Sequence, residues 1–309
     1  MSSKATSNGK GFEGAFALQV QKQIKESLNI PVALLNDSPT NTGIEKLNSL
    51  SPDTKDGMLS DAKQGVTKIL ESELKNNPHI FNAKHATVRL MPDKVGTIGD
   101  VTDVEIRFSN DCLICVSLKY HDDAIKHQRI ISDSNFARPW FGETADVKIE
   151  HQIQMSDIKR NIEEKAVERW GQISTFDKCM ELYQVNTLVV KALKDLTYVG
   201  SKEDSAKHFF RFLVGVRNYY KLSVEPRGKC VTLEYFDVER LVDSVTSINN
   251  ICNVPHRCDT ISISFNNGWC FLLRLHNAES SYAWNLKYSV TVTSVDDNVK
   301  VCGIWKTAA

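Results

Sequence analysis

The segment from residue 99 to residue 121 carries acidic and basic side chains in an order that suits metal-assisted hydrolysis of a phosphodiester. Asp103 directly precedes the strand-like run VEIRF, and Lys119 lies near the end of the following run, CLICVSLKY. This chemistry requires a carboxylate that holds Mg²⁺ and a cation beside the attacking water, both on rigid neighbouring strands. Asp103 and Lys119 are therefore candidates for the carboxylate and for the cation of such a site.

The alternation of side chains along a strand decides which of these groups can meet. Asp103 and Glu105 share one face of their strand, and Ser117, Lys119 and His121 share one face of the next. The groups converge if the two faces coincide. Acidic and basic residues at strand ends are also common without a catalytic role, so the spacing by itself leaves a structural interpretation open.

The elements that must position these groups can be read from hydrophobic periodicity. The run 112–120 is apolar on both faces, which is typical of a central strand covered on each side. Asp122 and Asp123 are expected to cap a helix that continues to residue 131. The other expected helices span 11–28, 60–74, 148–170, 176–193 and 201–220, with a short one near 44–48. The other expected strands span 85–91, 103–108, 229–236, 260–265, 269–275 and 286–293.

This order of elements predicts an α/β or α+β enzyme-sized fold with a mixed central sheet flanked by helices. We expect a single unit over residues 1–309. Within it, residues 1–145 form the core with the N-terminal helices, 146–225 a helical segment, and 226–309 a β-rich region.

Composition excludes several classes of protein. The 309 residues are 41% hydrophobic and 25% charged, which excludes general disorder. The 38 basic and 38 acidic residues balance, unlike those of a general nucleic-acid coat protein. Because the start is polar and no apolar run approaches the length of a membrane helix, we expect a cytoplasmic protein without a signal peptide.

Two further motifs give only weak signals. The glycines at 9, 11 and 14 spell GxGxxG, but no strand precedes them, so a dinucleotide site is not expected. The eight cysteines are interpreted as free thiols. Cys112 and Cys115 form a single CxxC without a properly spaced second pair, which is weak evidence for zinc.

Longer stretches carry a resemblance to a known family. They are GDVTDV followed by SLKYHDDAIKHQR, then FLVGVRNYYKLSVEP, then LLRLHNAESS with NLKYSV after it. In this order they resemble the HaeIII-type restriction endonucleases within the PD-(D/E)xK nuclease superfamily. The polar start followed by GFEGAF is similar to the opening helix of that family.

The resemblance implies a PD-(D/E)xK-type nuclease core and a type II restriction endonuclease. Such an enzyme uses Mg²⁺ to cut double-stranded DNA at a short palindrome, here GGCC, and leaves 5′-phosphate and 3′-hydroxyl ends. A palindrome suits two symmetry-related copies, so a homodimer is expected, at least on DNA. A cognate DNA methyltransferase is expected to protect the host genome, and residues 226–309 are expected to recognise the DNA.

One position departs from the superfamily pattern. The second acid is expected two residues before the lysine, but this position is Ser117. Glu105, Asp100 and Glu13 are therefore candidates for the second carboxylate, and Asp103 remains the first choice for the metal ligand.

Residues that could contact DNA are basic or amide side chains near these motifs. Lys126, His127 and Arg129 are expected on the helix after the catalytic strand, where they could bind backbone phosphates. The candidates for reading bases are Arg227, Lys229, His256, Arg257, Arg274, His276 and Asn277.

Two other functions remain open at this point. Because Ser117 replaces the usual acid, the chain could be a sequence-specific DNA-binding protein on a nuclease fold that has lost catalysis. It could also be a repair nuclease that selects branched DNA and ignores sequence.

Overall fold

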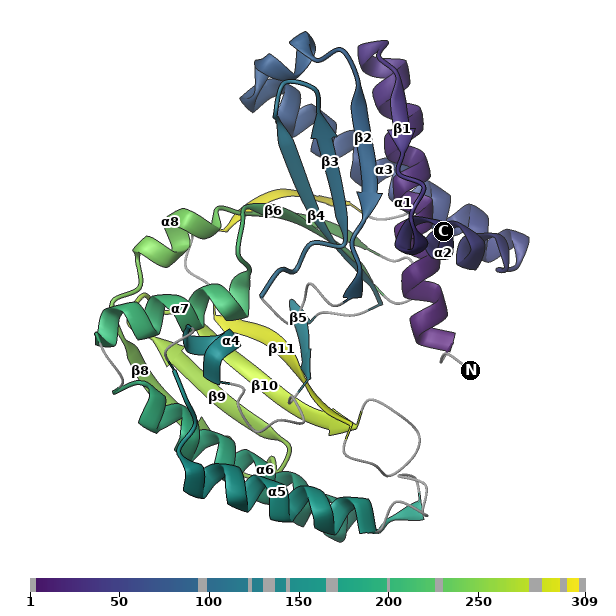
Figure 1. Ribbon diagram of the computed structural model, residues 1–309. Coiled ribbons are helices and arrows are strands. Elements are labelled where there is room, and N and C mark those ends of the chain that lie inside the picture. The colour runs from purple at the N-terminus through teal and green to yellow at the C-terminus, as the bar shows by residue number, and fades with distance from the viewer. Residues whose placement is uncertain are drawn as a thin grey trace.

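The computed structural model contains two β-sheets, each with its own set of helices (Figure 1). One sheet occupies the upper part of Figure 1 beside α1 and α3, and the other lies below it beside α5 and α6. The described residues are 4–93, 99–121, 124–129, 137–142, 145–164, 172–198, 201–225, 230–277, 285–294 and 299–305.

The first sheet has seven strands in the order β1-β2-β3-β4-β6-β7-β12. It is mixed, because β1 is parallel to β2 and β4 is parallel to β6, whereas the other pairs are antiparallel. Its strands are β1 (Val32–Leu34), β2 (Ala86–Leu90), β3 (Val104–Phe108), β4 (Leu113–Tyr120), β6 (Tyr219–Val224), β7 (Val231–Phe236) and β12 (Lys300–Trp305). The apolar strand β4 is the central one, as expected.

The second sheet has five antiparallel strands in the order β5-β11-β10-β9-β8. A turn at Asn267 and Gly268 joins β9 to β10, and Gly268 has a φ of 84°, which favours glycine. The strands are β5 (Lys126–Arg129), β8 (Ile248–Asn253), β9 (Thr260–Phe265), β10 (Cys270–Asn277) and β11 (Leu286–Ser294).

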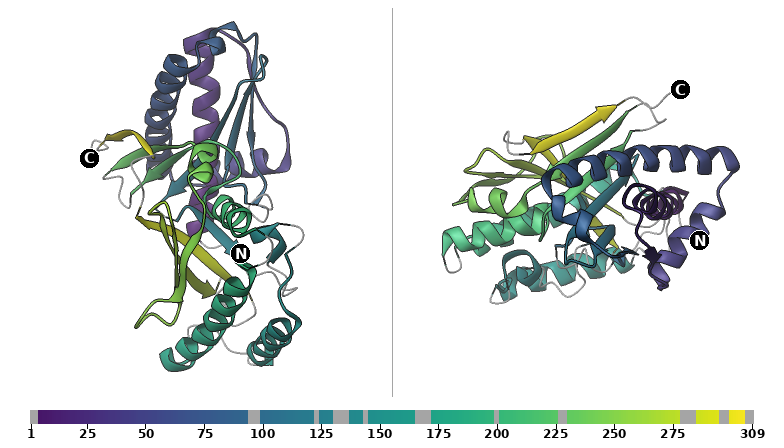
Figure 2. Two further views of the ribbon diagram at one scale, coloured as in Figure 1. Left: turned by 90° about the vertical axis from the view of Figure 1, so that its left-hand side faces the viewer. Right: turned by 90° about the horizontal axis from the view of Figure 1, so that it is seen from above.

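Two groups of helices cover the sheets. The helices α1 and α3 pack against each other and against the first sheet, and α6 packs against β8, β9 and β10. Figure 2 shows α1 and α3 side by side at the end of the molecule opposite α5 and α6. The helices are α1 (Lys4–Leu28), α2 (Ser38–Asn48), α3 (Pro52–Asn76), η1 (Pro78–Asn82), α4 (Ala137–Phe141), α5 (Ile149–Glu164), α6 (Thr175–Leu196), α7 (Lys202–Val214) and α8 (Val238–Asp243).

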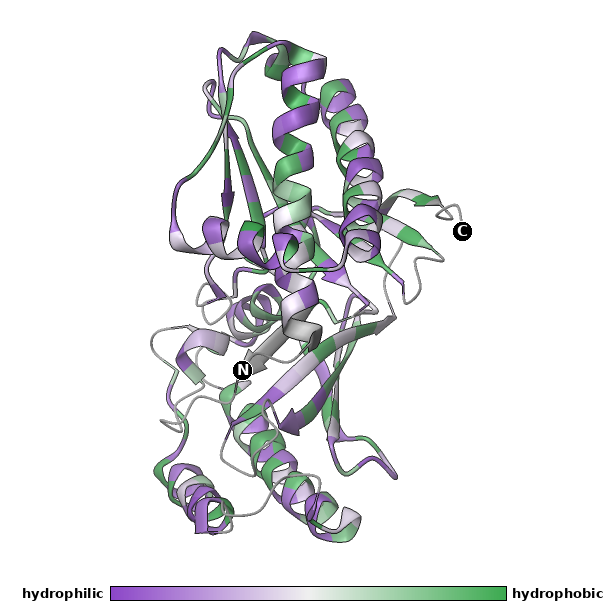
Figure 3. Ribbon diagram, turned by 90° about the vertical axis from the view of Figure 1, so that its right-hand side faces the viewer, coloured by the Kyte–Doolittle hydropathy of each residue, from purple (hydrophilic) through white to green (hydrophobic). Residues whose placement is uncertain are grey.

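Apolar periodicity explains why α1 lies on the first sheet. Phe12, Phe16, Val20 and Ile24 recur every four residues and are all fully buried. In Figure 3, hydrophobic and hydrophilic bands alternate along α1 and α3, as expected of helices with one buried side. Gly14 lies against the backbone of α2, so this glycine permits close helix packing and takes no part in a phosphate-binding loop.

The two faces of the first sheet belong to different apolar cores. Val116, Leu118 and Leu222 pack in the core that contains α1 and α3. Cys115 and Tyr219 belong to the other core, which contains α6, α7 and the second sheet. The polar side chains of β3 and β4 discussed below lie on this second face.

Three sequence-based predictions are wrong. The segment expected as a helix to residue 131 contains β5, because its backbone pairs with β11 and forms an edge strand of the second sheet. The helix expected to reach residue 220 ends at Val214, because Gly215 has a φ of 141°, and Tyr219 begins β6. Cys179 and Cys258 form a disulfide, so not all eight cysteines are free.

The helices in the described part of the chain include none that is long and apolar enough to cross a membrane.

The strands β6, β7 and β12 of the seven-stranded sheet come from beyond residue 146. The central sheet is therefore completed by chain segments from all three ranges considered in the sequence.

Candidate active site

Asp103, Ser117 and Lys119 come together on one face of the central strands. The Oδ2 atom of Asp103 accepts hydrogen bonds from Ser117 Oγ at 3.2 Å and from the backbone N–H of Leu118 at 2.6 Å. Lys119 Nζ lies 3.5 Å from the same oxygen. The structure thus brings Asp103 together with Ser117 and Lys119. Glu105 pairs with two arginines instead, and the ring of His121 stacks on Tyr120.

The β3–β4 pairing fixes this geometry. Val104 lies opposite Val116, which places the preceding residue, Asp103, opposite Ser117. The backbone N–H of Asp103 donates to the carbonyl of Val116 at 2.9 Å, and its own carbonyl accepts from Met91 at 2.9 Å. The carboxylate is thus held at the end of β3 by neighbours on both sides.

Glu13 is a second carboxylate near this group. It lies on α1 and is only 9% exposed, and Lys10 Nζ contacts its Oε2 atom at 2.9 Å. Lys10 also contacts Asp93 at 2.6 Å. Burial and the negative charge of Asp103 raise the pKa of Glu13 to about 8 despite Lys10. Asp103 is therefore close enough to Glu13 to disfavour the negative charge of Glu13.

Asp100 and Glu105 are instead joined to Arg217. The guanidinium contacts Asp100 Oδ2 at 3.2 Å and Glu105 Oε2 at 3.4 Å. Arg107 also contacts Glu105, at 3.1 Å. Asp100 is buried and additionally accepts a hydrogen bond from the backbone of Thr102 at 3.0 Å. These two acids form an ion-pair network that anchors the segment before Asp103.

Arg217 is the residue that the sequence analysis missed. It lies after α7, and its partner Glu105 is 112 residues away in the sequence. In the sequence, Arg217 lies in the stretch FLVGVRNYYKLSVEP, shortly before two tyrosines that are buried in the fold. A charged residue beside buried aromatic residues is the sign that could have identified it. The two tyrosines pack in the two apolar cores, one on each face of the sheet.

Several candidates for DNA contact lie in the second sheet. Arg274 and His276 lie on β10, where Arg274 Nε contacts Asp259 at 2.8 Å and His276 Nε2 lies 2.8 Å from Ser289 Oγ. Asn277 ends the same strand, and Arg257 lies in the turn before β9.

The backbone of β5 brings another candidate segment to this sheet. Lys126, His127 and Arg129 lie on β5, and Arg129 is paired with Lys287 on β11. Lys287 is in turn paired with His276 on β10. Arg227 and Lys229 lie outside the described residues. The two segments 126–129 and 274–277 are thus separated by one strand.

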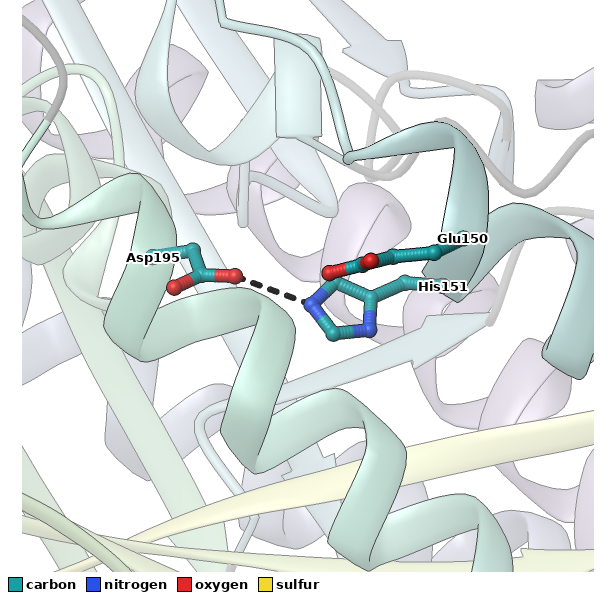
Figure 4. A group of neighbouring side chains, drawn as sticks. All are labelled: Glu150, His151 and Asp195. Carbon is teal, nitrogen blue, oxygen red and sulfur yellow. Dashed lines mark hydrogen bonds and ion pairs between the residues drawn. The ribbon is translucent and has the colours of Figure 1, made fainter.

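Another group of possible metal ligands lies between α5 and α6. Glu150, His151 and Asp195 place ligand atoms within 4.8 Å of one another, and Figure 4 shows His151 directed toward Asp195. His151 Nε2 lies 2.9 Å from Asp195 Oδ2, and Lys148 Nζ lies 2.9 Å from the same oxygen. Hydrogen bonds from His151 and Lys148 hold the pKa of Asp195 below its usual range. The group is therefore an ion-pair network that ties α5 to α6.

The mixed sheet flanked by helices and the second, antiparallel sheet agree with an α+β nuclease fold. A family model described as HaeIII restriction endonuclease matches residues 9–296. The chain belongs to this family, as the resemblance in its sequence indicated.

One curated relative is the "Type II restriction enzyme HaeIII" of Haemophilus aegyptius. It is 22% identical over 314 residues, a match that covers 96% of each chain. No solved structure matches the chain. The family match includes Asp103 and Lys119, the part of α1 that carries Glu13, and all five strands of the second sheet.

Proposed function

We propose that the protein is a type II restriction endonuclease that hydrolyses double-stranded DNA in a Mg²⁺-dependent reaction. The proposed site is the palindrome GGCC, and the proposed products carry 5′-phosphate and 3′-hydroxyl ends. The observation that carries this proposal is the contact of Lys119 with Asp103 at 3.5 Å, on the central strands of a chain in this family.

The donor atoms at this position fit Mg²⁺, which prefers carboxylate oxygens. Asp103 uses Oδ2 for its contacts with Ser117, Leu118 and Lys119, and no partner of Oδ1 is recorded among the described residues. Glu13 uses Oε2 for Lys10. Each carboxylate therefore has a second oxygen to offer, and we assign Asp103 and Glu13 as the residues that would hold the ion.

Glu105 and Asp100 are weaker candidates for this role. Their carboxylates are already neutralised by Arg217, and Glu105 also by Arg107. A metal ion at either acid would have to replace an arginine contact or tolerate the nearby positive charge. In our proposal these acids position the segment that leads into Asp103.

The side chains of the chain divide the remaining tasks of hydrolysis. When bound, Mg²⁺ supplies a positive charge that polarises the scissile phosphate. Lys119 positions the attacking water and offsets negative charge that builds up on the phosphate oxygens. The water oxygen forms a bond to phosphorus while the bond to O3′ breaks, which yields the two proposed ends. Ser117 keeps Asp103 oriented through its hydrogen bond.

The second sheet is the proposed site of DNA recognition. Its strands β5, β10 and β11 bring together the segments 126–129 and 274–277, which hold most of the basic candidates. Only five residues separate β4 from β5, so the catalytic strand leads directly into this sheet. Two copies of the chain would match the symmetry of a palindrome, and a methyltransferase of the same specificity would protect the host DNA.

One observation favours a second candidate function. Serine occupies position 117, where the superfamily pattern has a carboxylate beside Asp103. A DNA-binding protein that has lost catalysis would not need this carboxylate. Lys119 argues against this candidate, because its ammonium still lies beside Asp103.

Cleavage of unmethylated phage DNA tests the proposal. Purified protein and Mg²⁺ should give discrete fragments whose sequenced ends all fall at GGCC, with a phosphate on the 5′ end. If all fragment ends fell at another repeated sequence, the protein would still be a site-specific endonuclease, but its recognition site would not be GGCC. Intact DNA that is nevertheless shifted in a gel would favour the silent DNA-binding protein, and cutting of flaps or branches alone would favour a repair nuclease.

A further inference from the structure

A second lysine stands on the same sheet face as Lys119. The strand β6 is parallel to β4, and Lys221 is paired with Ser117, while Ser223 is paired with Lys119. Paired residues on neighbouring strands direct their side chains to the same face of a sheet. The neighbours of Lys221 along β6, Tyr220 and Leu222, pack in the core on the opposite face.

Lys221 belongs to a polar row that crosses four strands. Asp103, directly before β3, lies opposite Ser117 on β4. Ser117 is paired with Lys221 on β6, and Lys221 is paired with Glu234 on β7. Strands lie about 4.8 Å apart, so the Cα atoms of Asp103 and Lys221 are about 10 Å apart. Only the small side chain of Ser117 stands between these two in the row.

The two lysines have equivalent surroundings. Lys221 Nζ lies 3.4 Å from Glu234 Oε2, with side chains 12% and 26% exposed. Lys119 Nζ lies 3.5 Å from Asp103 Oδ2, with the same two exposed fractions. Each lysine is therefore recessed in the sheet face, paired with one carboxylate, and open to solvent to the same small extent.

The electrostatics of Tyr219 link the two pairs. Burial is the main reason that the pKa of this phenol is raised, and the negative charges of Glu234 and Asp103 both add to the effect. Tyr219 on β6 is therefore within electrostatic reach of one carboxylate from each pair. Among the described residues the Lys221 ammonium contacts one carboxylate oxygen, and an ammonium has three N–H donors, so N–H groups remain for a ligand.

From these contacts we infer that Lys221 binds a backbone phosphate of the DNA strand that is cut, beside the Asp103–Lys119 pair. Glu234 holds the ammonium in place when DNA is absent. Lys221 is then a second cation on this sheet face that contacts the substrate. It lies in the same row as Ser117, the position where the superfamily pattern has an acid. This inference rests on the proposed function, because it requires that DNA occupy the sheet face that carries Asp103.

The test compares Lys221→Met with Lys300→Met. Lys300 lies on β12 of the same sheet, is exposed, and is paired with Tyr235, whose neighbour Glu234 faces the polar row. Binding to a duplex is measured in EDTA over a range of salt concentrations, and the single-turnover rate of cleavage is measured with Mg²⁺. Loss of one phosphate contact lowers the slope of log affinity against log salt by about 1.

The expected result for Lys221→Met is a salt slope reduced by about 1 and a cleavage rate reduced at least tenfold. Lys300→Met should change neither quantity. Lys221→Arg should keep the slope, because arginine also binds phosphate. Glu234→Gln should bind DNA more tightly than the parent, because the carboxylate no longer competes with the phosphate.

Two results would overturn the inference. One is an unchanged salt slope in Lys221→Met. The other is equal loss of thermal stability in Lys221→Met and Glu234→Gln with rates that follow the folded fraction, as expected of a purely structural ion pair. If the parent protein does not bind or cut DNA, the proposed function is contradicted. If the parent cuts DNA and Lys221→Met cuts it at the same rate, only the inference about Lys221 is contradicted.

Discussion

Ser117 Oγ donates a hydrogen bond to Asp103 Oδ2 across the β3–β4 pair, at a distance of 3.2 Å. A neutral hydroxyl thus occupies the position where the superfamily pattern expects a second acid. One oxygen of Asp103 is oriented by the protein, and the strands contribute one carboxylate to the site instead of two. In our proposal the other carboxylate is that of Glu13 on α1, whose pKa is raised in part by the negative charge of Asp103.

Substitution of Ser117 by aspartate should make the stability of the protein depend on Mg²⁺. Ser117 is 1% exposed, so a second carboxylate beside Asp103 should lower the free energy of unfolding in EDTA by about 3 kcal/mol. A bound cation would offset this repulsion. Thermal unfolding of Ser117→Asp with and without Mg²⁺ measures the effect.

Ser117→Asn is the matched control, because it has nearly the same shape without the charge. We expect Mg²⁺ to raise the melting temperature of Ser117→Asp by several degrees more than that of Ser117→Asn. An equal increase for the two variants would mean that no metal ion binds beside Asp103.

Asp61 on α3 should make the protein less stable as the pH rises. It is buried without a recorded partner among the described residues, and burial raises its pKa to about 6 from the usual 3.8. Between these values the unfolded chain releases the proton and the folded protein keeps it, so stability falls with rising pH. The full penalty, about 3 kcal/mol, is present above pH 6.

Asp61→Asn should therefore be more stable than the parent at pH 7 and closely similar to it at pH 4. Urea unfolding at the two values measures the difference. Asp56→Asn, an exposed aspartate on the same helix, serves as the control and should show no such pH dependence. A stability gain of Asp61→Asn that is the same at both pH values would exclude the charge as its cause.

The disulfide between Cys179 and Cys258 should stabilise the protein. It joins α6 to the turn between β8 and β9 and closes a loop with a sequence separation of 79. A loop of this length corresponds to about 4 kcal/mol in the chain-entropy description. Cys258→Ser should lower the free energy of unfolding of the oxidised protein by a large part of this amount.

Cys252→Ser, on the neighbouring strand, is the control, because this cysteine is free. A reducing agent should bring the parent to the stability of Cys258→Ser and leave that variant unchanged. Equal stability of the oxidised and reduced parent would show that the bond adds nothing to the fold.

Arg217 should support cleavage from outside the reacting groups. Without its guanidinium, the buried Asp100 would lose its ion pair, at a cost of about 2 kcal/mol because Arg217 itself is partly exposed. The segment that leads into Asp103 would then lose one anchor. We expect Arg217→Met to reduce the cleavage rate about tenfold, a loss of about 1.4 kcal/mol in transition-state stabilisation.

Arg107→Met is the comparison for Arg217, since Arg107 contacts Glu105 but not Asp100 in the recorded ion pairs of the described residues. Its rate should stay within about threefold of the parent, as for an exposed ion pair. If the two variants lost the same activity, the anchoring of Asp100 would not be the cause.

Local patterns predicted much of the first sheet. The alternating runs gave β2, β3 and β4, and the run that was apolar on both faces became the central strand. The stripe of four apolar residues gave α1. In each of these elements, the residues that are buried in the folded protein are the apolar residues of the local sequence pattern. Local pattern and tertiary packing therefore favour the same structure.

The errors came from partners that are distant in the sequence. The segment 126–129 follows two aspartates that resemble a helix cap, but pairing with β11, more than 150 residues later, makes it a strand. Cys179 finds Cys258, and Arg217 finds Glu105, only in the folded chain. Asp103 and Lys119 could be predicted because a single hairpin joins them.

The central claim is that Asp103 and Lys119 act on DNA, and single-turnover cleavage of a duplex with the mapped site tests it most directly. Asp103→Asn and Lys119→Met should each cut at least 100-fold more slowly than the parent, or about 2.7 kcal/mol, while they still bind the duplex. Asp56→Asn should cut like the parent. Cleavage by Asp103→Asn or Lys119→Met at the rate of the parent would contradict this account of the active site.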